Sequence, residues 1–179
     1  SDSGDNIFLN FADHGGTGLL CFPNEYLYAN DLHTALDSMV KNKKFNKMVV
    51  YIEACEAGSM FDKILEENDN IFVSTASAPD ESSWGWYCDD PLGTCLGDLY
   101  SIRWMEHMDQ LVKAGLTGSE TLFHQYQWVR SAVNKSHVQI YGDFSLGFDT
   151  VSTYLGSGQK YRNSPVFLNQ ITPMKVSGI

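Results

Sequence analysis

Three short apolar runs are the feature that most constrains the fold of this chain. Residues 7–12, 48–52 and 71–75 are rich in β-branched and aromatic side chains, and their apolar residues are nearly continuous rather than alternating. Such runs are typical of strands that are covered on both faces, as in parallel sheets. Helical patterns separate and follow them. The sequence therefore predicts an α/β fold with a mainly parallel central sheet flanked by helices.

The segments around these runs predict the remaining elements. Apolar residues recur at helical spacing over 32–40, with Asn30 or Asp31 as the expected N-cap and lysines at the carboxyl end. We also expect helices near 59–65, 98–112 and 119–133, a long loop over 77–97 and a short strand at 137–141. No compositional break divides the chain, so we expect one domain over 1–156, followed by an extension or linker over 157–179.

The charge of the chain excludes several classes of partner. The formal net charge is -10 and the pI is about 4.7, a balance that repels phosphate backbones and anionic membranes. No apolar run approaches the roughly 20 residues that a membrane-spanning helix needs. We expect neither nucleic acid nor membrane as a partner, and an acidic compartment suits the composition.

The cysteine and histidine spacings give no metal pattern. There is no Cys-x-x-Cys and no closely spaced histidine pair, so we expect neither a metal nor a cofactor. Cys88 and Cys95 flank a short stretch rich in turn residues and can close a disulfide in an oxidising compartment. Asn134 begins an Asn-Lys-Ser sequon that can accept a glycan in a secreted protein. The remaining histidines lack a partnering motif and are expected to be structural: His33, His107, His124 and His137.

Two polar segments follow the first two predicted strands. Asp13-His14-Gly15-Gly16 comes after the first, and residues 53–58, which include Cys55, come after the second. Parallel sheets place their sites beyond the carboxyl ends of the strands. A cysteine attacks a carbonyl only as a thiolate, and histidine is the usual group that takes its proton. We therefore predict that Cys55 and His14 meet, with a helix after Cys55 adding its positive end.

Each of these residues also has a less specific interpretation. A single loop histidine is usually surface or structural, and a single strand-end cysteine is most often a buried small hydrophobe. A catalytically silent module that keeps the fold is the rival from another functional class. No Gly-x-Ser-x-Gly elbow and no phosphate loop is present, which disfavours a serine hydrolase. The joint placement of Cys55 and His14, 41 positions apart with one predicted helix between them, favours the catalytic interpretation.

Several motifs, in order, resemble the legumains, the asparaginyl endopeptidases of lysosomes and plant vacuoles. They are DHGG at 13–16, YIEACEAGSM at 51–60, ESSWG at 81–85, CLGDLYS at 95–101 and YGD at 141–143. The resemblance covers about 1–156. It implies a caspase-like three-layer sandwich, a Cys55–His14 dyad, and an oxyanion site made by the N–H groups of Gly15 and Cys55.

The resemblance also implies a specificity. Family members cleave after Asn, and after Asp at lower pH, and some also join peptides. Glu53, Ser82 and Asp98 match the side of the S1 pocket that accepts from the substrate amide, and carboxylates there repel a charged Asp unless one group is protonated. Asp13 matches a position that the family can convert to a succinimide.

This chain departs from the family pattern at both ends. Legumains carry more than a hundred residues ahead of the segment that begins here, including the first strands and the basic S1 residues, and a prodomain after it. We expect a partial peptidase domain that is poorly active alone. The resemblance implies a lysosomal or vacuolar location reached through the secretory pathway, and protein substrates, the prodomain and cystatin-type inhibitors as partners. A transamidase subunit that attaches glycolipid anchors is the alternative from the same superfamily.

Overall fold

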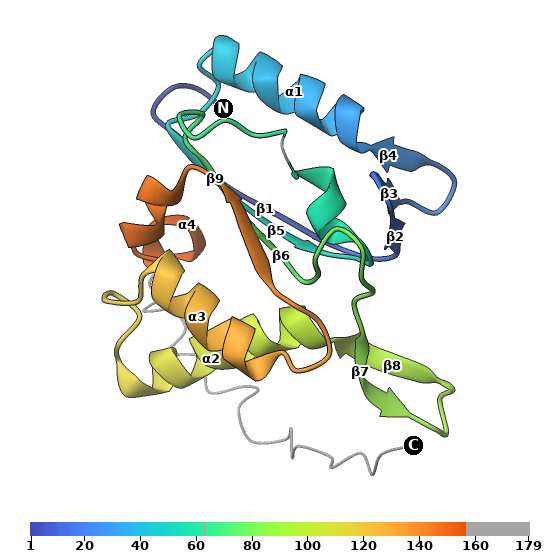
Figure 1. The fold of residues 1–179 in the computed structure, drawn as a ribbon. Helices are drawn as coiled ribbons and strands as arrows, with labels where there is room; N and C mark the ends of the chain where they lie inside the picture. The colour runs from blue at the N-terminus through green and yellow to red at the C-terminus, as the bar shows by residue number, and fades with distance from the viewer. Residues whose placement is uncertain (63, 157–179) are drawn as a thin grey trace.

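The computed structural model describes residues 1–62 and 64–156, which are built around a four-stranded sheet (Figure 1). The strand order is β1-β5-β6-β9. The strands are β1 (Asn6–Ala12), β5 (Lys47–Glu53), β6 (Ile71–Thr75) and β9 (Gln139–Gly142). β1, β5 and β6 run parallel, and β9 pairs antiparallel with β6. The predicted α/β fold with a mainly parallel sheet is confirmed.

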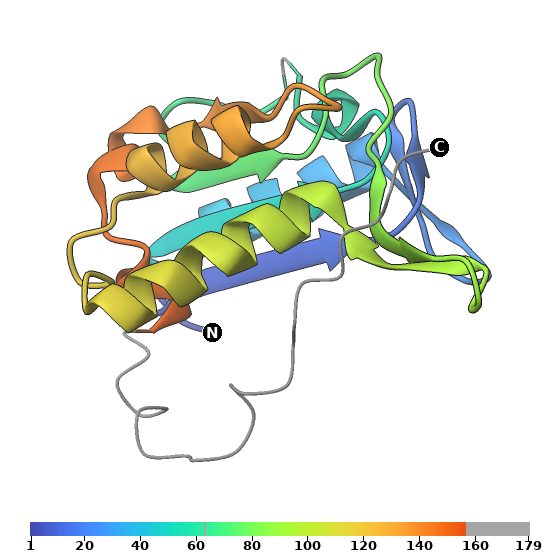
Figure 2. The same cartoon turned by 90° about the horizontal axis from the view of Figure 1, so that it is seen from below.

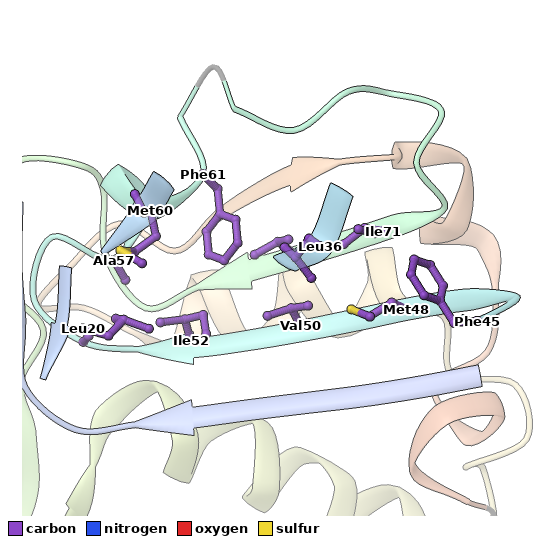
Figure 3. Close-up of a cluster of buried hydrophobic side chains, with 13 residues drawn as sticks. Leu20, Leu36, Phe45, Met48, Val50, Ile52, Ala57, Met60, Phe61 and Ile71 are labelled. Atoms are coloured by element: carbon purple, nitrogen blue, oxygen red, sulfur yellow. The ribbon is translucent and has the colours of Figure 1, made fainter. Parts of the chain in front are cut away.

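Helices cover both faces of this sheet (Figure 2). Helix α1 (Ala29–Lys41) packs on one face, and α2 (Leu99–Ala114) and α3 (Leu122–Ala132) pack on the other. Strand β5 alternates between them: Met48, Val50 and Ile52 join the cluster under α1 (Figure 3), while Val49 and Tyr51 join the cluster under α2 and α3. Burial on both faces explains the continuous apolar runs. The predicted three-layer arrangement and the three main helices are confirmed.

The expected loop over 77–97 is partly wrong. It contains a hairpin of β7 (Gly85–Asp89) and β8 (Thr94–Asp98), in which Cys88 lies opposite Cys95 and forms a disulfide with it. Both cysteines are exposed. The ribbon forms a separate two-stranded sheet, so its residues lack the buried alternation that identifies a strand from sequence. A second small sheet was not predicted: β2 (Gly15–Gly16), β3 (Leu19–Cys21) and β4 (Tyr26–Tyr28).

The helix expected near 59–65 is wrong. The chain forms only one 3-10 turn, η1 (Ala57–Met60), and leaves helical geometry at Phe61, whose φ is -131°. Met60 and Phe61 are both buried in the cluster under α1 (Figure 3). Burial of these two neighbouring side chains therefore determines the local backbone, and the helix does not continue. A turn this short gives Cys55 no extended helix dipole, so that part of the prediction is also wrong.

The remaining observations concern the start of α1 and the residues after β9. Helix α1 begins at Ala29, so the expected caps Asn30 and Asp31 lie inside the helix; its N-cap is Tyr28, which makes no side-chain capping bond. After β9 come η2 (Phe144–Phe148) and α4 (Ser152–Leu155). The extension predicted over 157–179 lies outside the described residues. Within the described ranges, no helix combines the length and the apolarity that crossing a bilayer requires.

Candidate active site

The candidate site lies where β1 and β5 end. The two strands are parallel neighbours, and the register pairs Ala12 with Glu53. The N–H of Asp13 continues this ladder, donating to the Glu53 carbonyl at 3.1 Å. His14 and Cys55 each lie two residues beyond the paired positions. The predicted placement of these two residues on adjoining strand ends, at one edge of the sheet, is therefore observed.

Gly15 brings the two strand-end segments into contact. A Cβ on Gly15 would lie 2.7 Å from the Cys55 carbonyl oxygen and 2.8 Å from the Cβ of Ala54, distances that no real side chain tolerates. The His14 carbonyl accepts a hydrogen bond from the N–H of Cys21 at 2.9 Å, which holds this segment against β3. The backbone after His14 therefore runs directly against the backbone at Cys55, and only glycine allows that approach.

Cys55 opens a tight turn. Glu56, the next residue, has a φ of 52°, in the left-handed region that non-glycine residues seldom adopt. Its N–H donates to the Glu81 carbonyl at 2.8 Å. The half-buried thiol of Cys55 lies 3.9 Å from both the carbonyl and the hydroxyl oxygen of Ser83. No acceptor among the described residues takes a hydrogen bond from the Cys55 N–H.

Glu53 is held by the amino end of α2. Only 1% of the residue is exposed, and its two carboxylate oxygens accept from the N–H of Tyr100 at 3.0 Å and of Ser101 at 2.6 Å. The N-cap residue of that helix, Asp98, makes no side-chain capping bond itself. Burial raises the pKa of Glu53 to about 7, although the hydrogen bonds from the helix oppose the shift. Glu53 therefore joins the site edge to α2.

Asp98 differs from Glu53 in its surroundings. It is partly exposed, and burial together with the charge of Asp13 raises its pKa, while His14 lowers it. The carboxylate of Asp98 therefore lies close enough to Asp13 and His14, in the segment after β1, for their charges to affect its pKa. Asp13 is exposed, and its carboxylate accepts from the His14 N–H at 2.7 Å. Ser82 is an exposed loop residue. The roles predicted for these residues remain predictions.

Sequence reasoning missed the residues that support this loop. The buried Ser77 hydroxyl donates to the Ala54 carbonyl at 2.9 Å and accepts from the Ala57 N–H at 3.1 Å. Glu81 accepts from the N–H of Ala78 and from both the N–H and the ring of His137. Burial alone would raise the pKa of Glu81, but the hydrogen bonds from Ala78 and His137, with the charge of His137, outweigh burial and lower this pKa. Glu81 is the first residue of the ESSWG motif, and Ser77 and His137 lie between recognised motifs, but no local pattern indicated that these residues support the loop.

The predicted glycan acceptor, Asn134, lies three residues before His137 in the chain. Asn134 is exposed, and the hydroxyl of Ser136, the third residue of the sequon, donates to the Ala76 carbonyl at 2.7 Å. Modification of Asn134 remains a prediction.

The sandwich and its strand-end cysteine and histidine define a caspase-like fold. A caspase-1 from Spodoptera frugiperda matches with a TM-score of 0.55 at 15% identity, over 77% of this chain and 60% of that one. The profile of the Peptidase C13 family matches residues 1–157. The chain belongs to this family.

Named relatives agree with the resemblance to legumains. Legumain from Homo sapiens is 43% identical over 97% of this chain, and the vacuolar-processing enzyme delta-isozyme from Arabidopsis thaliana is 40% identical over 100%. A hemoglobinase from Schistosoma japonicum is 42% identical over 89%. The alignments span 39%, 40% and 37% of these proteins, so the chain covers about two fifths of the length of its relatives.

Proposed function

We propose that this chain carries the catalytic residues of a cysteine endopeptidase that cleaves after Asn, and after Asp at lower pH. The main support is the β1–β5 register, which carries His14 and Cys55 to the same edge with Gly15 packed against the Cys55 backbone. The legumain, vacuolar-processing and hemoglobinase relatives favour an endopeptidase over a lipid-anchor transamidase.

The reaction begins at the thiol of Cys55. His14 takes the thiol proton, and the sulfur bonds to the substrate carbonyl carbon while the carbonyl π electrons move to oxygen. The N–H groups of Gly15 and Cys55 receive this oxyanion, and the N–H of Cys55, which has no acceptor in the described part of the chain, fits that role. Collapse expels the amine, which takes the proton from His14. Water, deprotonated by His14, then cleaves the thioester; another amine in its place would join two peptides.

The specificity follows from the carboxylates near the dyad. We assign Glu53, Ser82 and Asp98 to the side of the pocket that accepts from an Asn side-chain NH2. A charged Asp substrate is repelled by an ionised Asp98, whose pKa burial already raises. Acidification protonates one of these groups and removes the repulsion. Glu53 contributes by fixing the start of α2, next to Asp98.

The chain supplies part of a longer enzyme in this proposal. β1 pairs only with β5 among the described residues, so its other edge presents unpaired backbone groups to a further strand. We assign residues 1–156 to a partial peptidase domain and 157–179 to an extension or linker. The strands and basic S1 residues of the complete enzyme add at the β1 edge, and the chain alone is poorly active.

The biological setting follows from the same family. We propose a lysosomal or vacuolar enzyme that acts on proteins and is restrained by its own prodomain and by cystatin-type inhibitors. The disulfide between Cys88 and Cys95 supports passage through an oxidising compartment. The name of the vacuolar-processing relative supports the location.

An Asn-directed electrophilic peptide tests the proposal on the full-length protein at acidic pH. We expect covalent labelling that Cys55→Ser abolishes. Cys21→Ser is the matched control, because Cys21 is the other free cysteine found among the described residues, and it should leave labelling intact. Absence of labelling in the folded, full-length wild-type protein would favour the catalytically silent module, and labelling that persists in Cys55→Ser would remove Cys55 from the mechanism.

A further inference from the structure

A second polar cluster lies in the helical layer, away from the strand ends. His107 comes from α2, Glu120 lies just before α3, and His124 is in the first turn of α3. The Nε2 of His107 lies 2.7 Å from the Glu120 carboxylate, and the Nδ1 of His124 lies 2.8 Å and 2.9 Å from its two oxygens. One ligand atom from each of the three residues lies within 4.8 Å of the others.

The cluster contains a buried carboxylate without a permanent counter-charge. The side chains of His107 and Glu120 are 5% and 4% exposed, and that of His124 is 62% exposed. Among the described residues, only the two imidazoles pair with the Glu120 carboxylate, and no lysine or arginine does. A buried carboxylate is costly unless a cation compensates it, and neutral imidazoles carry no charge.

The donor set suits a divalent transition cation. Two imidazoles and a carboxylate are common zinc ligands, and tetrahedral coordination at roughly 2.0–2.1 Å separates ligand atoms by about 3.3 Å. The observed contacts of 2.7–2.9 Å would therefore open by about half an ångström. The exposure of His124 leaves a coordination position for water.

The ring of His107 can admit a cation without losing another bond. It stacks on Trp128 of α3, with ring centroids 4.3 Å apart and planes 21° apart, which fixes the ring with Nε2 toward Glu120. Its Nδ1 is buried and has no hydrogen-bond partner in the part of the chain that the structure describes. Moving the ring proton from Nε2 to Nδ1 therefore frees Nε2 as a ligand and breaks no bond at Nδ1. His124 can carry its proton on the ring nitrogen that faces away from Glu120.

We propose that His107, Glu120 and His124 bind a divalent cation of the zinc class and thereby tie α2 to α3. This differs from our expectation that the chain holds no metal and that both histidines are structural. That expectation rested on sequence spacing, whereas these ligands come from two helices and the loop between them. The proposal does not depend on the peptidase activity.

Cobalt absorption and zinc-dependent melting test the site on the full-length protein at neutral pH, where imidazoles are available as ligands. We expect visible d–d bands with cobalt and a rise in Tm with zinc. His124→Ala should weaken zinc binding by more than the roughly 10–100-fold that loss of an outer-shell partner costs, and should abolish the zinc-dependent rise in Tm. Because His124 is exposed, this variant should fold.

His137→Ala is the matched control. His137 is also exposed and pairs with one carboxylate, Glu81, but belongs to no three-ligand cluster among the described residues. It should keep the cobalt bands and the zinc response. Equal zinc binding by His124→Ala and the wild type would overturn the proposal, as would a wild type without any response. A cobalt spectrum of sulfur-to-metal charge transfer would assign the ion to thiolates and would also overturn it.

Discussion

The edge loops, residues 13–16 and 54–58, and the helical layer, α2 and α3, position polar groups in opposite ways. In the edge loops His14 is exposed and Cys55 half-buried, and backbone contacts set their places: the β1–β5 register, Gly15 and the turn at Glu56. In the helical layer Glu120 and His107 are buried and held by side-chain contacts. Glu53 connects the two regions, since it ends β5 and binds the start of α2.

Because of this difference, we expect substitutions in one region to change activity and substitutions in the other to change stability. An exposed side chain that is placed by backbone can be removed with little change in the free energy of unfolding, whereas a buried, hydrogen-bonded group cannot. Substitutions in the edge loops should therefore affect the proposed reaction, and substitutions of buried polar groups should affect folding.

The largest expected effect is that of His14→Ala. Loss of the proposed acid–base group should lower the rate of Asn-peptide cleavage by about 10²–10⁴-fold. The free energy of unfolding should change by no more than about 0.5 kcal/mol, because His14 is exposed. Kinetics and denaturant unfolding of the full-length protein measure the two quantities. A change of several kcal/mol in the free energy of unfolding, with cleavage activity retained, would contradict this prediction and show that His14 serves stability and not activity.

The next effect is a pH dependence of stability that comes from Glu53. Burial raises its pKa from an ordinary value of 4.5 to about 7, so between these values the folded state binds more protons than the unfolded state. Stability from this group is therefore fully present at acidic pH and is lost as pH rises toward neutral. The change is on the order of 3 kcal/mol.

Glu53→Gln isolates this contribution. The variant cannot titrate, so the difference in unfolding free energy between wild type and variant should vary across this pH window. Exposed Glu67→Gln should follow the wild-type curve. If the unfolding free energies of wild type and Glu53→Gln change with pH in the same way, the raised pKa of Glu53 is contradicted. The carboxylate would then not be buried as described.

Gly15→Ala should show that backbone geometry positions the edge loops. The new Cβ would meet the Cys55 carbonyl at 2.7 Å, so the two segments must separate. A displacement of about 1 Å costs roughly 100-fold in rate. Gly16→Ala is the control, because its nearest neighbour, a side-chain carbon of Leu19, would lie 3.6 Å away. Equal activity of the two variants would show that the contact does not position the reacting groups.

The sequence predicted what depends on burial pattern and chain order. The apolar runs identified the three parallel strands, and the strand order brought His14 and Cys55 to one edge. The rest depends on contacts distant in sequence. Glu53 meets the N–H groups of α2 47 and 48 positions away, and the ring of His107 meets Glu120 across a loop. No local pattern encodes such pairs, and the exposed β7–β8 hairpin has no buried face to reveal it.

The smallest expected effect concerns this hairpin. For a separation of 7 residues, chain entropy gives the Cys88–Cys95 disulfide at most about 2.5 kcal/mol. The hairpin also contacts α2, through Arg103 over the ring of Trp86 and a hydrogen bond from Tyr87 to Glu106. Because these contacts persist without the disulfide, the Cys88→Ser/Cys95→Ser variant should lose only about 1 kcal/mol in denaturant unfolding. Cys55 labelling should be unchanged, since the register of β1 and β5 does not involve the hairpin and Glu53 holds the start of α2, next to Asp98, without the disulfide. Loss of labelling in a folded variant would show that the hairpin, and not the strand register alone, positions the edge loops.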